Sequence, residues 1–255
     1  MIKFFRKIRQ NLLSEGKTEK YLKYAVGEII LVVIGILIAL SINNWNENRK
    51  KIAQEQSILE RLQADITSDL IDITSQMGTI KENTKQLSFC VDVILGNSES
   101  NLLDFRKNFS PILSLTFFDQ NKTTFNNIVS SEQIEVIKNK KLADSITKYY
   151  NFNYKGWDTA MLDYTRNIIA PFMLNFDHMP LASEGTENEN FTKIDINNSK
   201  IIPKTIKDYQ EEVFILNSLR QKIYNMEGQQ LAYENLKIYM GKLLKQLNNE
   251  LEYQK

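Results

Sequence analysis

Hydrophobic positions divide the chain into one long apolar run and two long stretches with helical spacing. From Ala25 to Ile42 every residue is apolar or glycine except Glu28 and Ser41. Eighteen helical residues are about 27 Å long, close to the roughly 30 Å hydrocarbon core of a bilayer. The pattern therefore predicts a transmembrane helix over residues 25–42.

Tyr24 and Trp45 flank this run, about 32 Å apart along a helix, a separation that suits the two aromatic belts of a membrane. One alternative is the buried core helix of a soluble protein. Another is a cleaved signal peptide, because Ala39-Leu40-Ser41 resembles a cleavage site. About 24 residues precede the run, whereas signal peptides keep a short basic region there. We therefore favour a retained anchor.

Basic residues indicate the orientation. Residues 1–24 contain seven Lys or Arg and two acidic residues, whereas residues 43–62 contain four Lys or Arg. The positive-inside bias places the N-terminus in the cytoplasm and residues 43–255 in the periplasm of a bacterial inner membrane. The arm of residues 1–24 has an apolar and a basic helical face, which predicts contact with the inner leaflet or with a cytosolic partner.

Two features stand out within the apolar run. Gly27, Gly35 and Ala39 share one helical stripe, and small residues at such spacing let two membrane helices approach closely. Glu28 is costly in hydrocarbon, which makes it a functional candidate. It lies near the cytoplasmic end, however, so a carboxylate at headgroup level beside Lys23 is the simpler interpretation.

The first long helical stretch follows the apolar run and ends at Gly96-Asn97-Ser98, a typical stop signal. Apolar or semi-apolar residues recur there at steps of three and four, which predicts one long helix with coiled-coil-like spacing. The positions are Leu59, Leu62, Ile66, Leu70, Ile73, Met77, Ile80, Thr84, Leu87, Val91 and Ile94.

The second long stretch runs from Lys204 to about Tyr253 with similar spacing. Its expected buried side comprises Val213, Leu216, Leu219, Ile223, Met226, Tyr233, Leu236, Met240, Leu243, Leu247 and Leu251. Between the two stretches, Asn139 is a candidate N-cap for a helix over 140–175, and residues 181–203 form a polar loop. The fold predicted is all-α: a transmembrane helix followed by an elongated antiparallel bundle with coiled-coil-like helices.

Composition narrows the function classes. Nine Gly and four Pro argue against a turn-rich all-β fold, and a single cysteine, Cys90, excludes an intramolecular disulfide. Beyond the apolar run the chain carries 25 basic and 28 acidic residues, a net charge of −3. This region lacks the basic footprint of a nucleic-acid-binding protein.

Residues with catalytic spacing are scarce. The one histidine, His178, lies beside Asp177 without a second histidine or a cysteine nearby, which makes a poor metal site. There is no nucleophile elbow and no Gly-rich phosphate loop, so we expect no enzyme, cofactor or metal. The densest aromatic group includes Tyr149, Tyr150, Trp157 and Tyr164, which we interpret as core packing or as the lining of a ligand pocket.

The segment GEIILVVIGILIALSINNWNENRK resembles the signature of an uncharacterised family of small single-span inner-membrane proteins of Gram-negative bacteria. The matching positions are Gly27, Glu28, Ile29, Asn43, Trp45, Asn46 and Glu47. Residues 123–150 resemble the second block of that family, with Ser131 where the family has glycine. The resemblance implies a short basic arm, a single span and a helical outer region, and it implies no catalytic activity.

Two functions follow as hypotheses. The first is a non-enzymatic membrane protein whose periplasmic helices mediate protein–protein interaction or assembly, with the bilayer and either a second copy or another membrane protein as partners. The second is a periplasmic sensory bundle that binds a small ligand and signals through a membrane partner, because 24 cytoplasmic residues are too few for an output domain.

Overall fold

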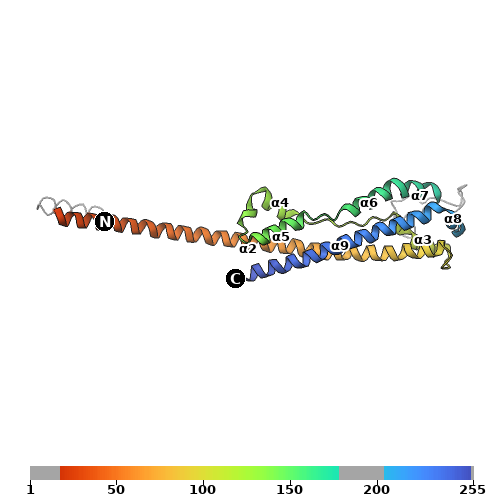
Figure 1. The fold of residues 1–255 in the computed structure, drawn as a ribbon, viewed down its shortest axis with the longest axis horizontal. Coiled ribbons are helices and arrows are strands. Elements are labelled where there is room, and N and C mark those ends of the chain that lie inside the picture. The colour runs from red at the N-terminus through yellow and green to blue at the C-terminus, as the bar shows by residue number, and fades with distance from the viewer. Residues whose placement is uncertain (1–17, 178–203, 254–255) are drawn as a thin grey trace, which may run out of the picture. The chain divides into compact units, whose positions relative to one another are not determined.

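The computed structural model describes residues 18–177 and 204–253, and most of these residues are helical, with no strand among them (Figure 1). The α-helices are α2 (Thr18–Ile94), α3 (Leu102–Phe109), α4 (Thr123–Ser130), α5 (Lys140–Tyr150), α6 (Gly156–Tyr164), α7 (Ala170–Phe176), α8 (Ile206–Glu211) and α9 (Val213–Tyr253). Two short 3₁₀ turns (η1, Ser110–Leu113; η2, Gln133–Val136) and a π-helical turn (η3, Thr165–Ile169) complete the list. The arm of residues 1–17, His178 and the loop at 181–203 lie outside the described residues.

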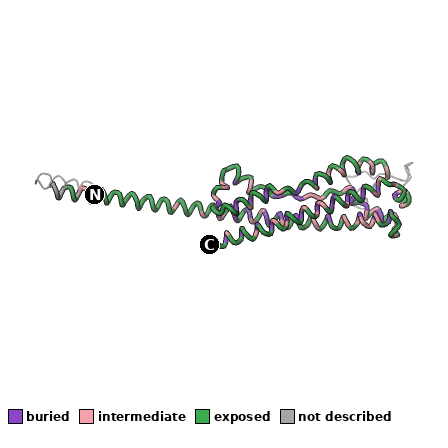
Figure 2. Tube along the Cα trace, viewed as in Figure 1, coloured by how far each residue is buried: buried purple, intermediate pink, exposed green. Residues whose placement is uncertain are grey.

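The chain forms two compact units, residues 1–57 and residues 58–253. Within the first unit, α2 is the one described helix long and apolar enough to cross a membrane, with a mean hydropathy of 2.8 and no buried residue in its most apolar stretch. Figure 2 shows this part of α2 almost entirely exposed. Trp45 follows the apolar run, and the Arg49 guanidinium lies 5.7 Å from the centre of its ring.

In the second unit, the later part of α2 buries the side that its spacing predicts. Seven of the eleven predicted positions are buried, and the other four, Leu70, Met77, Thr84 and Val91, are half-buried; none is exposed. The helix ends at Ile94, and Gly96 follows with a φ of 75°, the left-handed conformation that favours glycine. The predicted end of this helix is therefore confirmed.

The helix α9 lies antiparallel to this part of α2, as three hydrogen bonds show. Gln63 donates to Asn248, Thr84 Oγ1 contacts Met226 Sδ at 3.7 Å, and Gln210 Nε2, on α8, donates to Val93 O at 3.0 Å. Residue numbers thus rise along α2 while they fall along the partner helices. Residues of α5 and α6 contact α9 along its length and cover the core from another side (Figure 1).

The prediction of a single helix over residues 140–175 is wrong, because α5 and α6 are separate helices there. Asn139 does cap α5, with its side chain accepting from Leu142 N at 3.2 Å, but the helix stops at Tyr150. Long-range contacts hold the break: Lys122 Nζ donates to Tyr150 O at 3.1 Å, and Lys155 pairs with Asp119. The chain resumes as α6 and continues through η3 into α7, with Pro171 in the first turn of α7.

The helix predicted from Lys204 is also interrupted. Thr205 and Asp208 form a capping box that begins α8, and the extended backbone of Glu212 separates α8 from α9. The buried side of α9 is as predicted from Met226 to Leu251, but Val213, at the start of α9, is 67% exposed. The first buried residue of α9 is Ile215, and Val213, two residues earlier, lies about 200° around the helix and so faces away from the buried side.

Asp177, which follows the last residue of α7, lies beside Lys204, which precedes the N-cap of α8. Lys204 N donates to Asp177 Oδ1 at 3.3 Å, and Tyr209 OH donates to Asp177 Oδ2 at 2.5 Å. Arg106 forms an ion pair with the same carboxylate at 2.6 Å. Burial lowers the pKa of Arg106, but the hydrogen bond and charge of Asp177 outweigh it and raise that pKa, which keeps the guanidinium charged.

Candidate functional site

The four aromatic residues proposed from the sequence as a ligand pocket lie in different environments. Tyr149 and Tyr150, at the end of α5, are buried, and their ring centres lie 4.8 Å apart, edge to face. Trp157, on α6, is half-buried and lines a groove beside α9. Tyr164 is half-buried and does not line that groove. The structure therefore brings Tyr149 and Tyr150 together in the core and sets Trp157 apart.

An extended segment, residues 114–122, connects η1 to α4 and determines where buried polar side chains are needed. It has no neighbouring strand, so its backbone groups need partners from elsewhere. Side chains of the surrounding helices supply them. Gln229 Nε2 donates to Thr116 O at 2.7 Å, and Phe118 N donates to Tyr233 OH at 2.9 Å. Gln120 N donates to Tyr154 OH at 3.3 Å, and Asn121 N donates to Asp69 Oδ1 at 2.9 Å.

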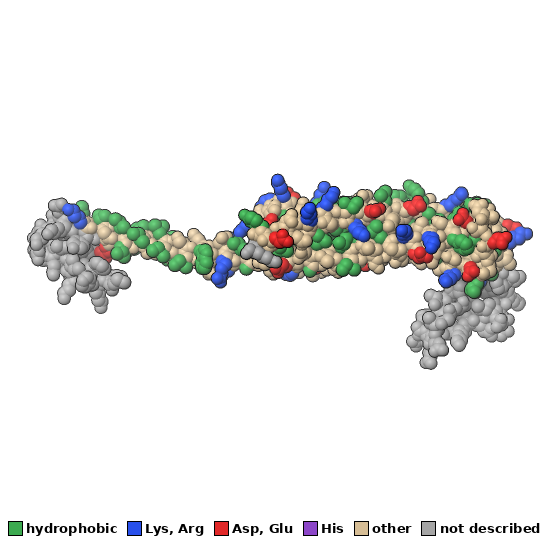
Figure 3. Space-filling model, turned by 90° about the horizontal axis from the view of Figure 1, so that it is seen from below, with side chains coloured by type: hydrophobic (Ala, Val, Ile, Leu, Met, Phe, Trp, Pro, Cys, Tyr) green, Lys and Arg blue, Asp and Glu red, His purple; other side chains and the backbone are tan. Residues whose placement is uncertain are grey.

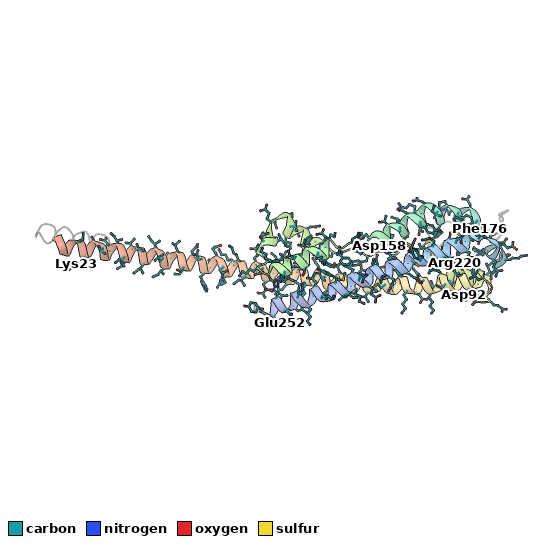
Figure 4. All side chains as sticks on the ribbon, viewed as in Figure 1. Lys23, Asp92, Asp158, Phe176, Arg220 and Glu252 are labelled. Carbon is teal, nitrogen blue, oxygen red and sulfur yellow. The ribbon has the colours of Figure 1, made fainter. Side chains whose placement is uncertain are left out.

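We use the term polar core for Asp158, Lys222, Gln229 and Tyr233, all nearly inaccessible to solvent. Asp158, labelled on α6 in Figure 4, accepts from Gln229 Nε2 at 2.7 Å and from Tyr233 OH at 2.8 Å through one oxygen. Burial raises the pKa of Asp158, and these two hydrogen bonds act in the opposite direction. The carboxylate is thus a fixed acceptor that holds two donors of α9 against the extended segment.

Lys222 is the most unusual member of the polar core, because it is completely buried. Its Nζ donates to Ser114 O at 2.9 Å and to Thr165 Oγ1 at 2.6 Å. Thr165 begins the π-helical turn, in which Ala170 N donates to Thr165 O. Both acceptors are neutral, and burial lowers the pKa of the ammonium to about 8.

A second buried contact links α2 with α5. Tyr149 OH donates to Asp69 Oδ2 at 2.6 Å, and Gln120 Nε2 donates to Tyr149 O at 2.7 Å. Burial raises the pKa of Asp69, opposed by the hydrogen bonds from Tyr149 and Asn121. These polar groups, like those of the polar core, are occupied by protein partners, so their arrangement is that of a structural network.

The described residues contain no group of three or more His, Cys, Asp or Glu side chains that could hold a metal ion. Cys90 is buried, its Sγ lies 3.7 Å from Phe105 O, and burial raises the pKa of its thiol to about 12. A thiol of this kind is a small core residue rather than a nucleophile.

A surface groove of about 530 Å³ lies between α9 and the connection from α5 to α6. Its volume is typical of a site for a small molecule. Its lining comprises Phe152, Asn153, Trp157, Gly228, Leu231, Ala232, Asn235, Ile238, Tyr239 and Lys242. Aromatic rings form one wall, with the ring centres of Phe152 and Tyr239 5.9 Å apart.

Gly228 permits the close approach of Trp157 to α9. A Cβ placed on Gly228 would lie 2.4 Å from Trp157 Cε2, far inside contact distance. The indole therefore lies against the backbone of α9 and also meets the Tyr224 ring edge to face, with centres 5.5 Å apart. The groove exists in this form because a glycine occupies this turn of α9.

An exposed apolar stripe runs along α9 and through the groove. It consists of Tyr224, Leu231 and Ile238, seven residues apart, with exposed fractions of 59%, 61% and 53%. The opposite side of α9 forms the buried seam with steps of three and four residues. A helix with two apolar faces in heptad register commonly contacts neighbours on both sides.

The candidate residues in the apolar run lie on α2 in the first unit. Gly35 and Ala39 are exposed, and nothing lies within 4 Å of a Cβ placed at Gly27 or Gly35. Glu28 is half-buried and has interaction partners. The helix-pairing role of the three small residues and the functional role of Glu28 stay predictions.

A family model matches residues 28–167, which is more than half of the chain, and its description is a family of unknown function, DUF6090. The chain belongs to this family. The match to DUF6090 begins within the apolar run and ends in η3, so it includes the extended segment, Trp157 and Asp158. No curated protein and no solved structure matches the chain.

Sequence reasoning missed Lys222, Gln229 and the groove. A signal for the first two exists, because both positions lie seven residues apart in the seam that also carries Leu219, Met226 and Tyr233. Polar residues in an otherwise apolar seam indicate a buried polar contact. The groove has no comparable signal, since it depends on the break at 151–155 and on the packing of α6 against α9.

Proposed function

We propose that the chain is a non-enzymatic, single-pass inner-membrane protein of bacteria whose helical outer region binds a protein partner. In this proposal residues 25–42 span the bilayer, the N-terminus is cytoplasmic, and residues 43–255 form an elongated antiparallel bundle with coiled-coil-like helices in the periplasm. The partner is a second copy or another membrane protein. The helical fold, the apolar helix and the membership of DUF6090 are consistent with this role.

The exposed stripe on α9 is the observation that carries the proposal. Three large apolar side chains at seven-residue spacing match the anchors that a helical partner would need. They continue into a groove that is walled by aromatic rings, which are enriched in protein interfaces. The face of the second unit in Figure 3 carries Lys, Arg, Asp and Glu side chains intermixed, which is typical of a solvated surface rather than a nucleic-acid interface.

Photo-crosslinking in native membranes tests this interface. Leu231→Cys carries a benzophenone maleimide, and Ile71→Cys on α2 is the matched control, because Ile71 is apolar and 69% exposed but lies outside the stripe. The native Cys90 is buried and its thiol pKa is about 12, so only the introduced cysteine reacts. We expect a discrete crosslinked species from position 231 at several times the yield from position 71. Equal yields, or none from position 231, would refute the interface.

Assembly through the membrane helix is a separate part of the proposal. Gly27, Gly35 and Ala39 would form the contact face between two copies of residues 25–42. Disulfide formation compares Ala39→Cys with Leu37→Cys, which lies about 200° around the helix. The proposal expects dimers from position 39 in preference to position 37, and equal dimer yields would contradict this face.

A second candidate function, ligand sensing, is supported by the groove. Its volume and its mixture of aromatic, apolar and amide side chains fit a small molecule. In this role the outer region would bind the ligand and pass the signal to a partner in the membrane. A thermal-shift screen of the full chain with a broad set of metabolites tests it, and no stabilisation by any compound would exclude it.

A further inference from the structure

The groove beside α9 has a distribution of side chains that defines a class of ligand. Trp157 and Leu231 line it near Gly228, where the indole packs against the backbone of α9. The half-buried rings of Trp157, Phe152 and Tyr239 present apolar faces and edges to the groove. Such a wall complements a flat ring system, because aromatic pairs add attraction beyond the area they bury.

The other end of the groove is basic. Lys242 lines it, and Lys148, on α5, places its ammonium 5.8 Å from the centre of the Tyr239 ring. Among residues 18–177 and 204–253, neither lysine forms an ion pair with a carboxylate, in contrast to Lys140 and Lys155, which do. One ammonium group in the lining and a second beside the lining residue Tyr239 are complementary to an anionic group.

Neutral polar groups complete the site. Asn153 and Asn235 line the groove, and their side-chain amides make no hydrogen bond within the described part of the chain. Both can donate to a ligand oxygen or accept from a ligand N–H. The groove lining contains no carboxylate, so a cationic ligand would find no charged partner in it.

We propose that this groove binds a small aromatic anion, with its ring system against Phe152 and Tyr239 and its anionic group toward Lys242 and Lys148. The proposal rests on the ligand-sensing function and specifies its ligand class and its residues. These residues differ from the pocket expected from the sequence, because none of Tyr149, Tyr150, Trp157 and Tyr164 holds the ligand in this proposal.

Calorimetric titration of the full chain in lipid nanodiscs tests the site with two matched probes. The first probe is 2-naphthoate and the second is 2-naphthamide, which has the same rings without the charge. Empty nanodiscs correct for partition into lipid. We expect 2-naphthoate to bind at least about tenfold more tightly than 2-naphthamide, the factor for one charge-assisted contact of about 1.4 kcal/mol.

The variant K148Q/K242Q removes both charges, and K81Q/K85Q, at two exposed lysines of α2, is its control. We expect K148Q/K242Q to bind both probes equally weakly, whereas K81Q/K85Q keeps the preference for 2-naphthoate. An unchanged preference in K148Q/K242Q, or equal affinities in the wild type, would overturn the inference. If 2-naphthoate does not bind while a compound of another class stabilises the chain in the thermal-shift screen, the inference fails and ligand sensing stands.

Discussion

Two lysines of α9, Lys222 and Lys242, illustrate how the same side chain serves different roles. Lys222 is fully buried in the polar core and donates to Ser114 O and Thr165 Oγ1. Lys242 is exposed in the groove and has no carboxylate partner among the residues of the described helices. The Lys222 ammonium is fully used in hydrogen bonds within the fold, whereas the Lys242 ammonium is available to a ligand.

The same contrast applies to the neighbouring polar groups. The side chains of Gln229, Tyr233 and Asp158 each have hydrogen-bond partners at 2.7 to 2.9 Å, whereas the side chains of Asn153 and Asn235 have none in the described part of the chain. Burial alone is therefore a poor guide to function here. The polar core explains how an extended segment is accommodated within a helical fold, and the groove is where recognition can occur.

The largest expected effect tests the polar core at Asp158. Asp158→Leu leaves two buried donors, Gln229 Nε2 and Tyr233 OH, without their acceptor, and we expect a loss of about 3 kcal/mol in the free energy of unfolding. The measurement is urea unfolding of the full chain in detergent, followed by circular dichroism.

Asp158→Asn is the matched control, because it keeps an acceptor oxygen and removes the charge. Burial raises the pKa of Asp158, so the charged carboxylate costs stability at neutral pH, and Asn avoids this cost. We expect Asp158→Asn to remain within about 1 kcal/mol of the wild type. Equal, small effects of Leu and Asn would mean that the two hydrogen bonds contribute little.

Two glycines of α9 test the groove wall. Gly228→Ala forces Trp157 off the helix, and we expect a loss of about 1–2 kcal/mol together with a change in Trp157 fluorescence in a W45F background. Gly241→Ala meets nothing within 4 Å and should gain about 0.5–1 kcal/mol from helix propensity. Effects of the same sign at both positions would show that Trp157 does not pack as described.

The pH dependence of stability tests Lys222. Its pKa falls to about 8 in the folded chain from 10.5 in the unfolded chain, so above pH 8 the unfolded chain binds more protons. Stability therefore increases with pH in this window, by up to about 1.4 kcal/mol per pH unit. Lys222→Met lacks this contribution, so the free energy of unfolding of the wild type should rise relative to that of the variant between pH 8 and 10.

The measured quantity is the difference in free energy of unfolding between wild type and Lys222→Met, because other groups titrate in the same pH range. Burial raises the pKa of Cys90 and of the buried tyrosines, so those groups lower stability as the pH rises through 9 and above. Both proteins contain them, so their effects cancel in the difference. A constant difference from pH 8 to 10 would mean that Lys222 titrates normally.

Local signals in the sequence were enough to predict much of the fold. The end of α2 before Gly96, the cap of α5 at Asn139 and most of the buried seam of α9 follow from turn chemistry and from apolar spacing. These features depend on neighbours within a few residues. A sequence shows such neighbours directly, so predictions of this kind succeed.

The features that were missed depend on long-range contacts. The break after Tyr150 is held by Lys122 and Asp119, about thirty residues away, and the extended segment is held by side chains of α9 more than one hundred residues away. The groove combines α9 with the connection at 151–155. Helical periodicity reports none of these pairings, which is why the expected aromatic pocket and the groove share Trp157 alone.

The most direct test of the contrast between polar core and groove is urea unfolding with and without 2-naphthoate, for the wild type, K222M and K148Q/K242Q. At ten times the dissociation constant, the ligand should stabilise the wild type by about 1.4 kcal/mol. We predict that K222M shows altered stability without ligand but the full ligand-induced gain, whereas K148Q/K242Q shows wild-type stability and no gain. Loss of the ligand-induced gain in K222M, or its retention in K148Q/K242Q, would contradict the separation of structure and recognition on α9.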